Sequence, residues 1–121
     1  VTVFLDACFS GGGRNEGMLA ARSVKIKPKK NQLNGNIVVF SAASEDEVAL
    51  PYNQNYHGLF TYFLLKKLQA TKGNVNYSEL ADYLKTQVFY HASDLKYIKQ
   101  TPQVESGLEL KDEWKTWKLC P

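Results

Sequence analysis

The sequence predicts an α/β fold in which a small sheet is covered by helices. Two short runs, residues 1–5 and 37–43, are apolar and rich in β-branched side chains, as buried strands are. Both runs are apolar on both faces, which is typical of a sheet with helices on each side. Residues 58–70 and 77–91 instead carry apolar side chains at helical spacing. The order strand, loop, strand, helix, helix therefore indicates part of an α/β sandwich.

The two predicted helices have clear boundaries, whereas the last strand does not. Asn76 can cap the second helix, with Glu79 placed three residues later as in a capping box. After residue 103 the pattern weakens, and a final strand is predicted near residues 107–110 or 114–119. Residues 14–35 are polar and basic and predict a mobile linker loop between the two strands.

Length and charge exclude several classes of protein. The chain has 121 residues, which suits one domain at most. Its net charge of +3 comes largely from a lysine run without interleaved aromatic residues, so a nucleic-acid partner is not expected. No stretch approaches the roughly 20 apolar residues of a membrane-spanning helix, so a membrane partner is not expected either. Two cysteines, Cys8 and Cys120, make no disulfide framework; the compartment is left open, with the cytoplasm slightly favoured.

The chain begins inside its first predicted strand. A domain rarely starts at its own core strand, and two or three strands cannot cover the predicted helices alone. We therefore expect residues 1–121 to form the C-terminal portion of one domain, with further strands supplied by preceding sequence.

Cys8 is the candidate nucleophile. It lies just past a predicted buried strand, and ligands gather at the carboxyl ends of strands in open α/β sheets. Its own N–H can help to stabilise an oxyanion, and Gly11 leaves room for a substrate backbone to approach. A free thiol has a pKa of about 8.5 and needs a base or a positive field to react efficiently. The alternative, which position alone slightly favours, is that Cys8 is a small buried apolar residue.

Four blocks of sequence carry a resemblance to a known family. The hexapeptide Asp6-Ala7-Cys8-Phe9-Ser10-Gly11 resembles the nucleophile motif of metacaspases and related bacterial caspase-like peptidases. Residues 40–47, 57–65 and 100–103 are similar to later blocks of the same family, in the same order. The resemblance implies part of a caspase-like three-layer α/β/α sandwich with a mainly parallel sheet. It also implies a thiol protease in which Cys8 acts in a Cys–His dyad.

The resemblance places the partner histidine at the end of the preceding strand, about 50 residues before the cysteine. The sequence given holds no residues there. His57-Gly58 imitates the family's His-Gly pair but opens a helix, and His91 lies near a helix C-terminus, where a cation is favoured for structural reasons. We therefore expect the chain to be inactive without the upstream half of the domain, which is its expected partner.

Asp6 is the candidate specificity residue. An aspartate at this place in metacaspases is associated with cleavage after Arg or Lys, and a carboxylate can pair with a guanidinium bidentately. The implied substrate is a peptide or protein with a basic P1 residue. Asp46 is a weaker second candidate, since its loop borders the same pocket in the family. The alternatives are a strand-end carboxylate that accepts backbone N–H bonds for Asp6, and a solvated loop acid for Asp46.

The predicted linker of residues 14–35 lies where caspases carry the segment that is cut on activation. It offers the residue types that a pocket built on Asp6 should accept, so self-cleavage is predicted at Arg22, Lys25, Lys29 or Lys30. Pro28 disfavours cleavage directly after Lys27. A soluble exposed loop is the equally weighted alternative.

No cofactor and no metal are expected. The glycines after Cys8 match neither the dinucleotide pattern nor a phosphate-binding P-loop, and the cysteines and histidines lack zinc-ligand spacing. Some metacaspases need calcium, but Asn15 stands where an aspartate would be sought, so calcium dependence is in doubt. The rival to a peptidase is a degenerate caspase-like domain that acts as a regulatory or interaction module.

Overall fold

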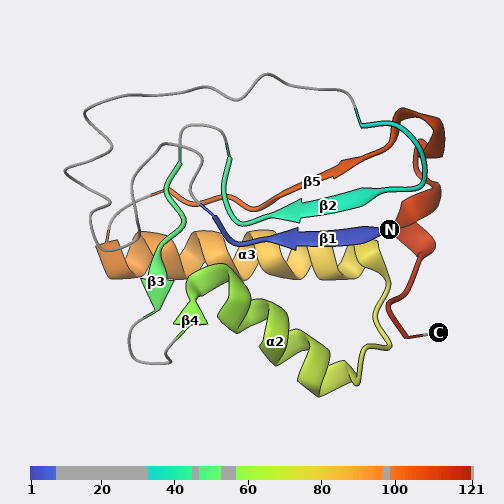
Figure 1. Cartoon of the computed structure of the whole chain (residues 1–121). Helices are drawn as coiled ribbons and strands as arrows, with labels where there is room; N and C mark the ends of the chain where they lie inside the picture. Colours follow the sequence, from blue (N-terminus) through green and yellow to red (C-terminus); the bar gives the residue numbers. More distant parts are fainter. Residues whose placement is uncertain (8–32, 45–46, 53–56, 97–98, 121) are drawn as a thin grey trace.

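The computed structural model describes residues 1–7, 33–44, 47–52, 57–96 and 99–120. Within these residues three strands form one sheet in the order β1 (Thr2–Leu5), β2 (Val38–Ser41), β5 (Gln103–Ser106). β1 pairs with β2 in parallel, and β5 pairs with β2 in antiparallel fashion (Figure 1). The two strands predicted within residues 1–5 and 37–43 are confirmed, and they are neighbours in the sheet. The described sheet as a whole is mixed, so the term mainly parallel fits only the β1–β2 pair.

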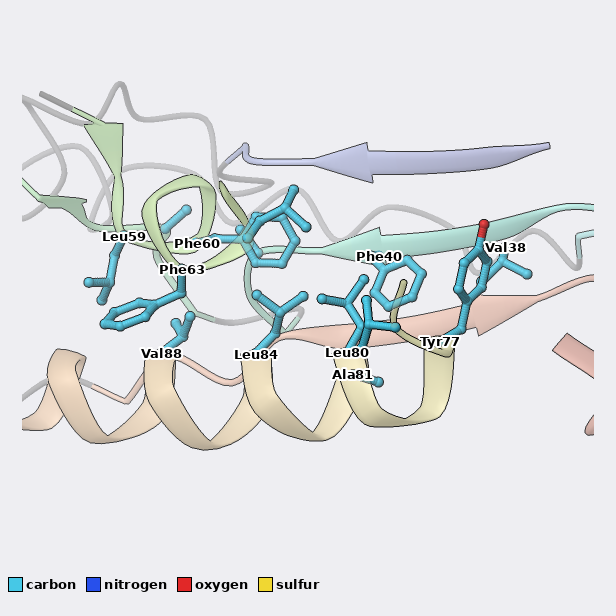
Figure 2. Close-up of a cluster of buried hydrophobic side chains, with 14 of the residues drawn as sticks. Val38, Phe40, Leu59, Phe60, Phe63, Tyr77, Leu80, Ala81, Leu84 and Val88 are labelled. Carbon is cyan, nitrogen blue, oxygen red and sulfur yellow. The ribbon is translucent and has the colours of Figure 1, made fainter. Parts of the chain in front are cut away.

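One hydrophobic core joins the sheet to two helices, α2 (Leu59–Thr71) and α3 (Tyr77–Lys96). Figure 2 shows α3 presenting apolar side chains toward Phe40 of β2 and Phe63 of α2. Val38 and Phe40 are fully buried, whereas Val39 and Ser41, on the other face of the same strand, are only half-buried. The described helices thus cover the Phe40 face, and the three-layer arrangement stays a prediction.

Both helices form where the sequence predicts them, with small shifts at their ends. α2 begins at residue 59 rather than 58, and α3 continues to residue 96 rather than 91. The Asn76 side chain accepts a hydrogen bond from the Glu79 backbone N–H at 2.8 Å, which confirms the predicted cap. A short hairpin, β3 (Pro51–Tyr52) and β4 (His57–Gly58), precedes α2 and was not predicted, because two-residue strands have no measurable alternation.

The predicted position of the last strand was wrong. β5 lies at residues 103–106, while residues 108–110 and 113–116 form short 3-10 helices, η2 and η3. β5 contains one apolar residue, Val104, which packs against the core opposite Phe40. A single apolar residue gives no period-2 pattern, and this is why the strand could not be recognised from the sequence.

The backbone of Gly107, just after β5, lies very close to the backbone that precedes β2. Its N–H donates to the Ile37 carbonyl at 2.9 Å, and a Cβ at Gly107 would lie 1.9 Å from the Gly35 carbonyl oxygen. We expect Gly107→Ala to lower the free energy of unfolding by about 2 kcal/mol or more, since the backbone must move to admit the methyl group.

Gly35→Asn is the matched control for Gly107→Ala. A Cβ at Gly35 meets no atom within 4 Å, so the cost of this variant is limited to the strain of a side chain at a positive φ of 85°, a region in which asparagine is several-fold enriched among non-glycine residues. Urea denaturation of both variants should show that Gly107→Ala lowers the free energy of unfolding more than Gly35→Asn does. Equal decreases in the free energy of unfolding would mean that the short distance between Gly35 and Gly107 imposes no steric constraint.

Candidate active site

The carboxyl ends of β1 and β2 meet at one edge of the sheet. The two strands are in parallel register from Thr2–Val38 to Leu5–Ser41, and the Ala42 N–H donates to the Leu5 carbonyl at 2.8 Å. The residues that directly follow both strands are therefore neighbours, and this is the edge where α/β sheets bind ligands.

Asp6 follows β1 at this edge and contacts the first turn of α2. Its Oδ2 accepts a hydrogen bond from Thr61 Oγ1 at 2.6 Å and one from the Thr61 backbone N–H at 3.3 Å. Asp6 is half-buried. The alternative interpretation of Asp6, a strand-end carboxylate that accepts backbone N–H bonds, thus describes real contacts. Its role in substrate binding stays a prediction.

Glu47 organises the loop that follows β2, and sequence reasoning missed it. Its Oε1 accepts from the Ser44 N–H at 3.0 Å and from the Thr101 N–H at 2.6 Å, and its Oε2 accepts from Thr101 Oγ1 at 3.2 Å. One carboxylate therefore joins two loops that lie 54 residues apart in sequence. Backbone N–H donors to an ionised carboxylate make charge-assisted bonds, which are stronger than neutral ones.

Gln100 makes a second link between the same two loops. Its side chain is fully buried. Its Nε2 donates to the Ala42 carbonyl at 2.9 Å, and its Oε1 accepts from the Leu50 N–H at 3.0 Å. The Gln-Thr-Pro-Gln block, noticed in the sequence only as a resemblance, thus holds both ends of the loop after β2. A buried amide with both polar atoms satisfied holds Ala42 and Leu50 at a fixed separation.

The two histidines occupy structural positions. His57 is exposed in β4, where it pairs with Tyr52. His91 lies on α3 with its ring centroid 4.7 Å from that of Phe63. That neither histidine is the partner base stays a prediction.

Several predicted site residues lie outside the described residues. They are Cys8, Gly11, Arg22, Lys25, Lys29, Lys30 and Asp46, with most of the predicted linker. Cys120 is described and exposed, and its N–H donates to the Gly73 carbonyl at 3.2 Å, beyond the C-terminus of α2.

Two features are absent from the described part of the chain. No group of three or more His, Cys, Asp or Glu residues is arranged there to hold a metal ion. Among the helices described, none has the length and apolar character needed to cross a membrane.

Comparison with known proteins gives one match. A family model described as caspase domain matches residues 1–112, which is nearly the whole chain and includes every block of the resemblance. No curated protein and no solved structure matches the chain.

Proposed function

The chain belongs to the caspase domain family, a family of cysteine peptidases, and from this premise we propose that it carries the nucleophile of a cysteine endopeptidase that cleaves after Arg or Lys. The observation that carries the proposal is the position of Asp6. Its carboxylate is held at the carboxyl end of β1, two residues before Cys8 in the sequence. An anionic group two residues before the nucleophile in the sequence suits a cationic P1 side chain.

The proposed reaction uses Cys8 in the usual manner of a thiol nucleophile. The Cys8 thiolate attacks the scissile carbonyl carbon, the amine leaves with a proton from the partner histidine, and a thioester forms. Water then attacks the thioester, gives one proton to the histidine and releases the acid together with the Cys8 thiolate. The Cys8 N–H stabilises the oxyanion, and Gly11 admits the substrate backbone. The histidine comes from the upstream half of the domain.

Specificity in this proposal rests on charge. Asp6 pairs with the P1 guanidinium or ammonium group, and Asp46 on the loop after β2 adds a second negative charge. The contacts of Glu47 and Gln100 support this assignment because they fix the described residues on either side of Asp46, Ser44 and Leu50 among them. No cofactor takes part, and Asn15 in place of an aspartate supports independence from calcium.

A degenerate regulatory domain is the second candidate, and one observation favours it. The two Thr61–Asp6 hydrogen bonds give an inactive domain a structural reason to keep Asp6. Asp6 alone therefore does not discriminate between the candidates. The residue about 50 positions before Cys8 does: a histidine there supports the peptidase, and another residue supports the regulatory domain.

Covalent labelling tests the assignment of the nucleophile. A peptide reagent that ends in an electrophilic Arg or Lys should label Cys8 of the intact protein and leave Cys120 unlabelled, because only an activated thiolate reacts quickly. Cys120→Ala should keep the label, and Cys8→Ala should lose it. Peptide mapping by mass spectrometry reads the site. Equal labelling of both cysteines would show that Cys8 is not activated.

Self-processing in the segment of residues 14–35 is a further prediction. The active protein should cut itself after Arg22, Lys25, Lys29 or Lys30, since these side chains match the proposed pocket. Fragment masses after incubation identify the site. The same cut in the Cys8→Ala protein, or an uncut segment in the active protein, would exclude self-processing here.

A further inference from the structure

We propose that Glu47 is a positioning residue for peptide binding: it holds the loop after β2 in place for contact with substrate residues other than P1. This loop is called the β2 loop, and its described residues are 44 and 47–50. The inference rests on the proposed function and adds to it a residue that follows a different strand from Cys8. Glu47 does not touch the reacting atoms in this proposal. It acts through the backbone of the β2 loop.

The β2 loop lies at the edge of the sheet where the nucleophile-bearing strand ends. β1 and β2 are parallel, and the Ala42 N–H, just after β2, donates to the Leu5 carbonyl at 2.8 Å. β5 runs in the opposite direction, so the residues before it reach the same edge (Figure 1). At its far end the loop meets the start of α2, since the Leu59 N–H donates to the Leu50 carbonyl at 2.9 Å. Loops at this edge are the ones that hold ligands in α/β folds.

Glu47 is the centre of the contacts that join the β2 loop to the residues before β5. Its carboxylate accepts from the backbone N–H groups of Ser44 and Thr101 and from the Thr101 hydroxyl. The Ser44 hydroxyl donates to the Thr101 carbonyl at 3.0 Å and accepts from Gln103 Nε2 at 2.7 Å. All four residues are half-buried. This junction is therefore held by polar contacts rather than by the hydrophobic core.

The second link between the two loops differs in its burial. Gln100 is fully buried, and both of its partners, Ala42 and Leu50, are buried as well. It keeps the two ends of the β2 loop in the core even without Glu47, so loss of Glu47 should release the junction with Thr101 and leave the fold intact. A loop that is ordered before binding receives a peptide at a lower entropic cost than a loop that must be ordered on binding.

Glu47→Met and Glu47→Gln form a matched pair of variants. Methionine has a similar length and offers no oxygen to the two N–H groups, whereas glutamine keeps one oxygen and can donate from Nε2 to Thr101 Oγ1. Gly107→Ala is the control for a general loss of stability, because Gly107 follows β5 at the end opposite to Thr101.

The readout is the ratio of two values of kcat/KM, measured with the intact protein. One substrate is a peptide with Arg at P1 and further residues on both sides, and the other is an acylated arginine amide without them. Rates are normalised to titrated active sites, and the Tm of each variant is recorded. Only the long peptide has residues that reach the β2 loop, and binding of such remote residues contributes to kcat/KM.

We expect Glu47→Met to lower the ratio of long to short substrate about tenfold, as loss of hydrogen bonds to a charged group does. Glu47→Gln should keep most of the ratio, and Gly107→Ala should lower the Tm without changing the ratio. Should the methionine variant not fold, Thr101→Val takes its place. It removes only the hydroxyl bond to Glu47 and should lower the ratio about threefold.

Two results would overturn the inference while the proposed function stands. In the first, the Glu47→Met protein, or the Thr101→Val protein in its place, cleaves both substrates with an unchanged ratio. In the second, Gly107→Ala lowers the ratio as much as Glu47→Met does, which would assign the effect to stability alone. If the intact, unmutated protein cleaves neither substrate, the proposed function fails and the inference fails with it.

Discussion

Replacing Cys8 with alanine is expected to abolish cleavage of Arg and Lys peptides by the intact protein. The substitution removes the sulfur that forms the thioester, so the covalent route is lost and kcat should fall by about 10³-fold or more. The fold should be unaffected, since alanine is smaller than cysteine and adds no polar group. Peptide cleavage assays together with circular dichroism measure the two effects separately.

Cys120→Ala is the matched control for this substitution. Cys120 is exposed and contacts Gly73 rather than the edge of the sheet at Asp6. Its removal should leave both kcat and KM unchanged. Full activity in the Cys8→Ala protein would show that another group is the nucleophile, and equal losses in both variants would point to a general effect on the protein.

Replacing Asp6 with asparagine is expected to have the second largest effect on activity. The change removes the negative charge that pairs with the P1 cation, and a buried pair that loses one partner costs a few kcal/mol, so kcat/KM for basic substrates should fall by roughly 100-fold. Asparagine has nearly the same shape as aspartate, and its side-chain oxygen can still accept from Thr61 in place of Oδ2. Steady-state kinetics with Arg and Lys peptides measure the loss.

The stability of the Asp6→Asn protein distinguishes the two roles of the carboxylate. Loss of charge at the start of α2 should lower the free energy of unfolding by only about 1 kcal/mol. A fall in stability with unchanged kcat/KM would assign Asp6 to the helix cap alone. Such a result would favour the degenerate regulatory domain over the peptidase.

The sequence predicts the elements that have strong local patterns. β1 and β2 are continuous apolar runs, and α2 and α3 have apolar stripes at helical spacing, so each is recognisable alone. The family assignment follows from motifs that lie in these elements or next to the strands, and it is confirmed by the match over residues 1–112. β5 was misplaced because Val104 is its single apolar residue.

The candidate site was predictable only in part, because its contacts join residues that are far apart in the sequence. Asp6 could be singled out because it lies in the nucleophile motif. The contact between Asp6 and Thr61 could not be predicted, because these residues are 55 positions apart in the sequence. Glu47 and Gln100 are polar residues in loops, and such residues usually face solvent. The burial of Gln100 depends on the Ala42 carbonyl and the Leu50 N–H, which the fold brings together from 58 and 50 positions away.

The most direct test of Cys8-dependent cleavage after basic residues is the cleavage profile of the intact protein on a peptide library without P1 bias. Mass spectrometry identifies every new terminus and therefore the residue on each side of the cut. We expect Arg or Lys at P1 in the cleavage products of the unmodified protein, and no products from the Cys8→Ala protein. Cleavage after Asp, or the same products from the Cys8→Ala protein, would contradict the assignment of Cys8 as nucleophile and Asp6 as its specificity residue.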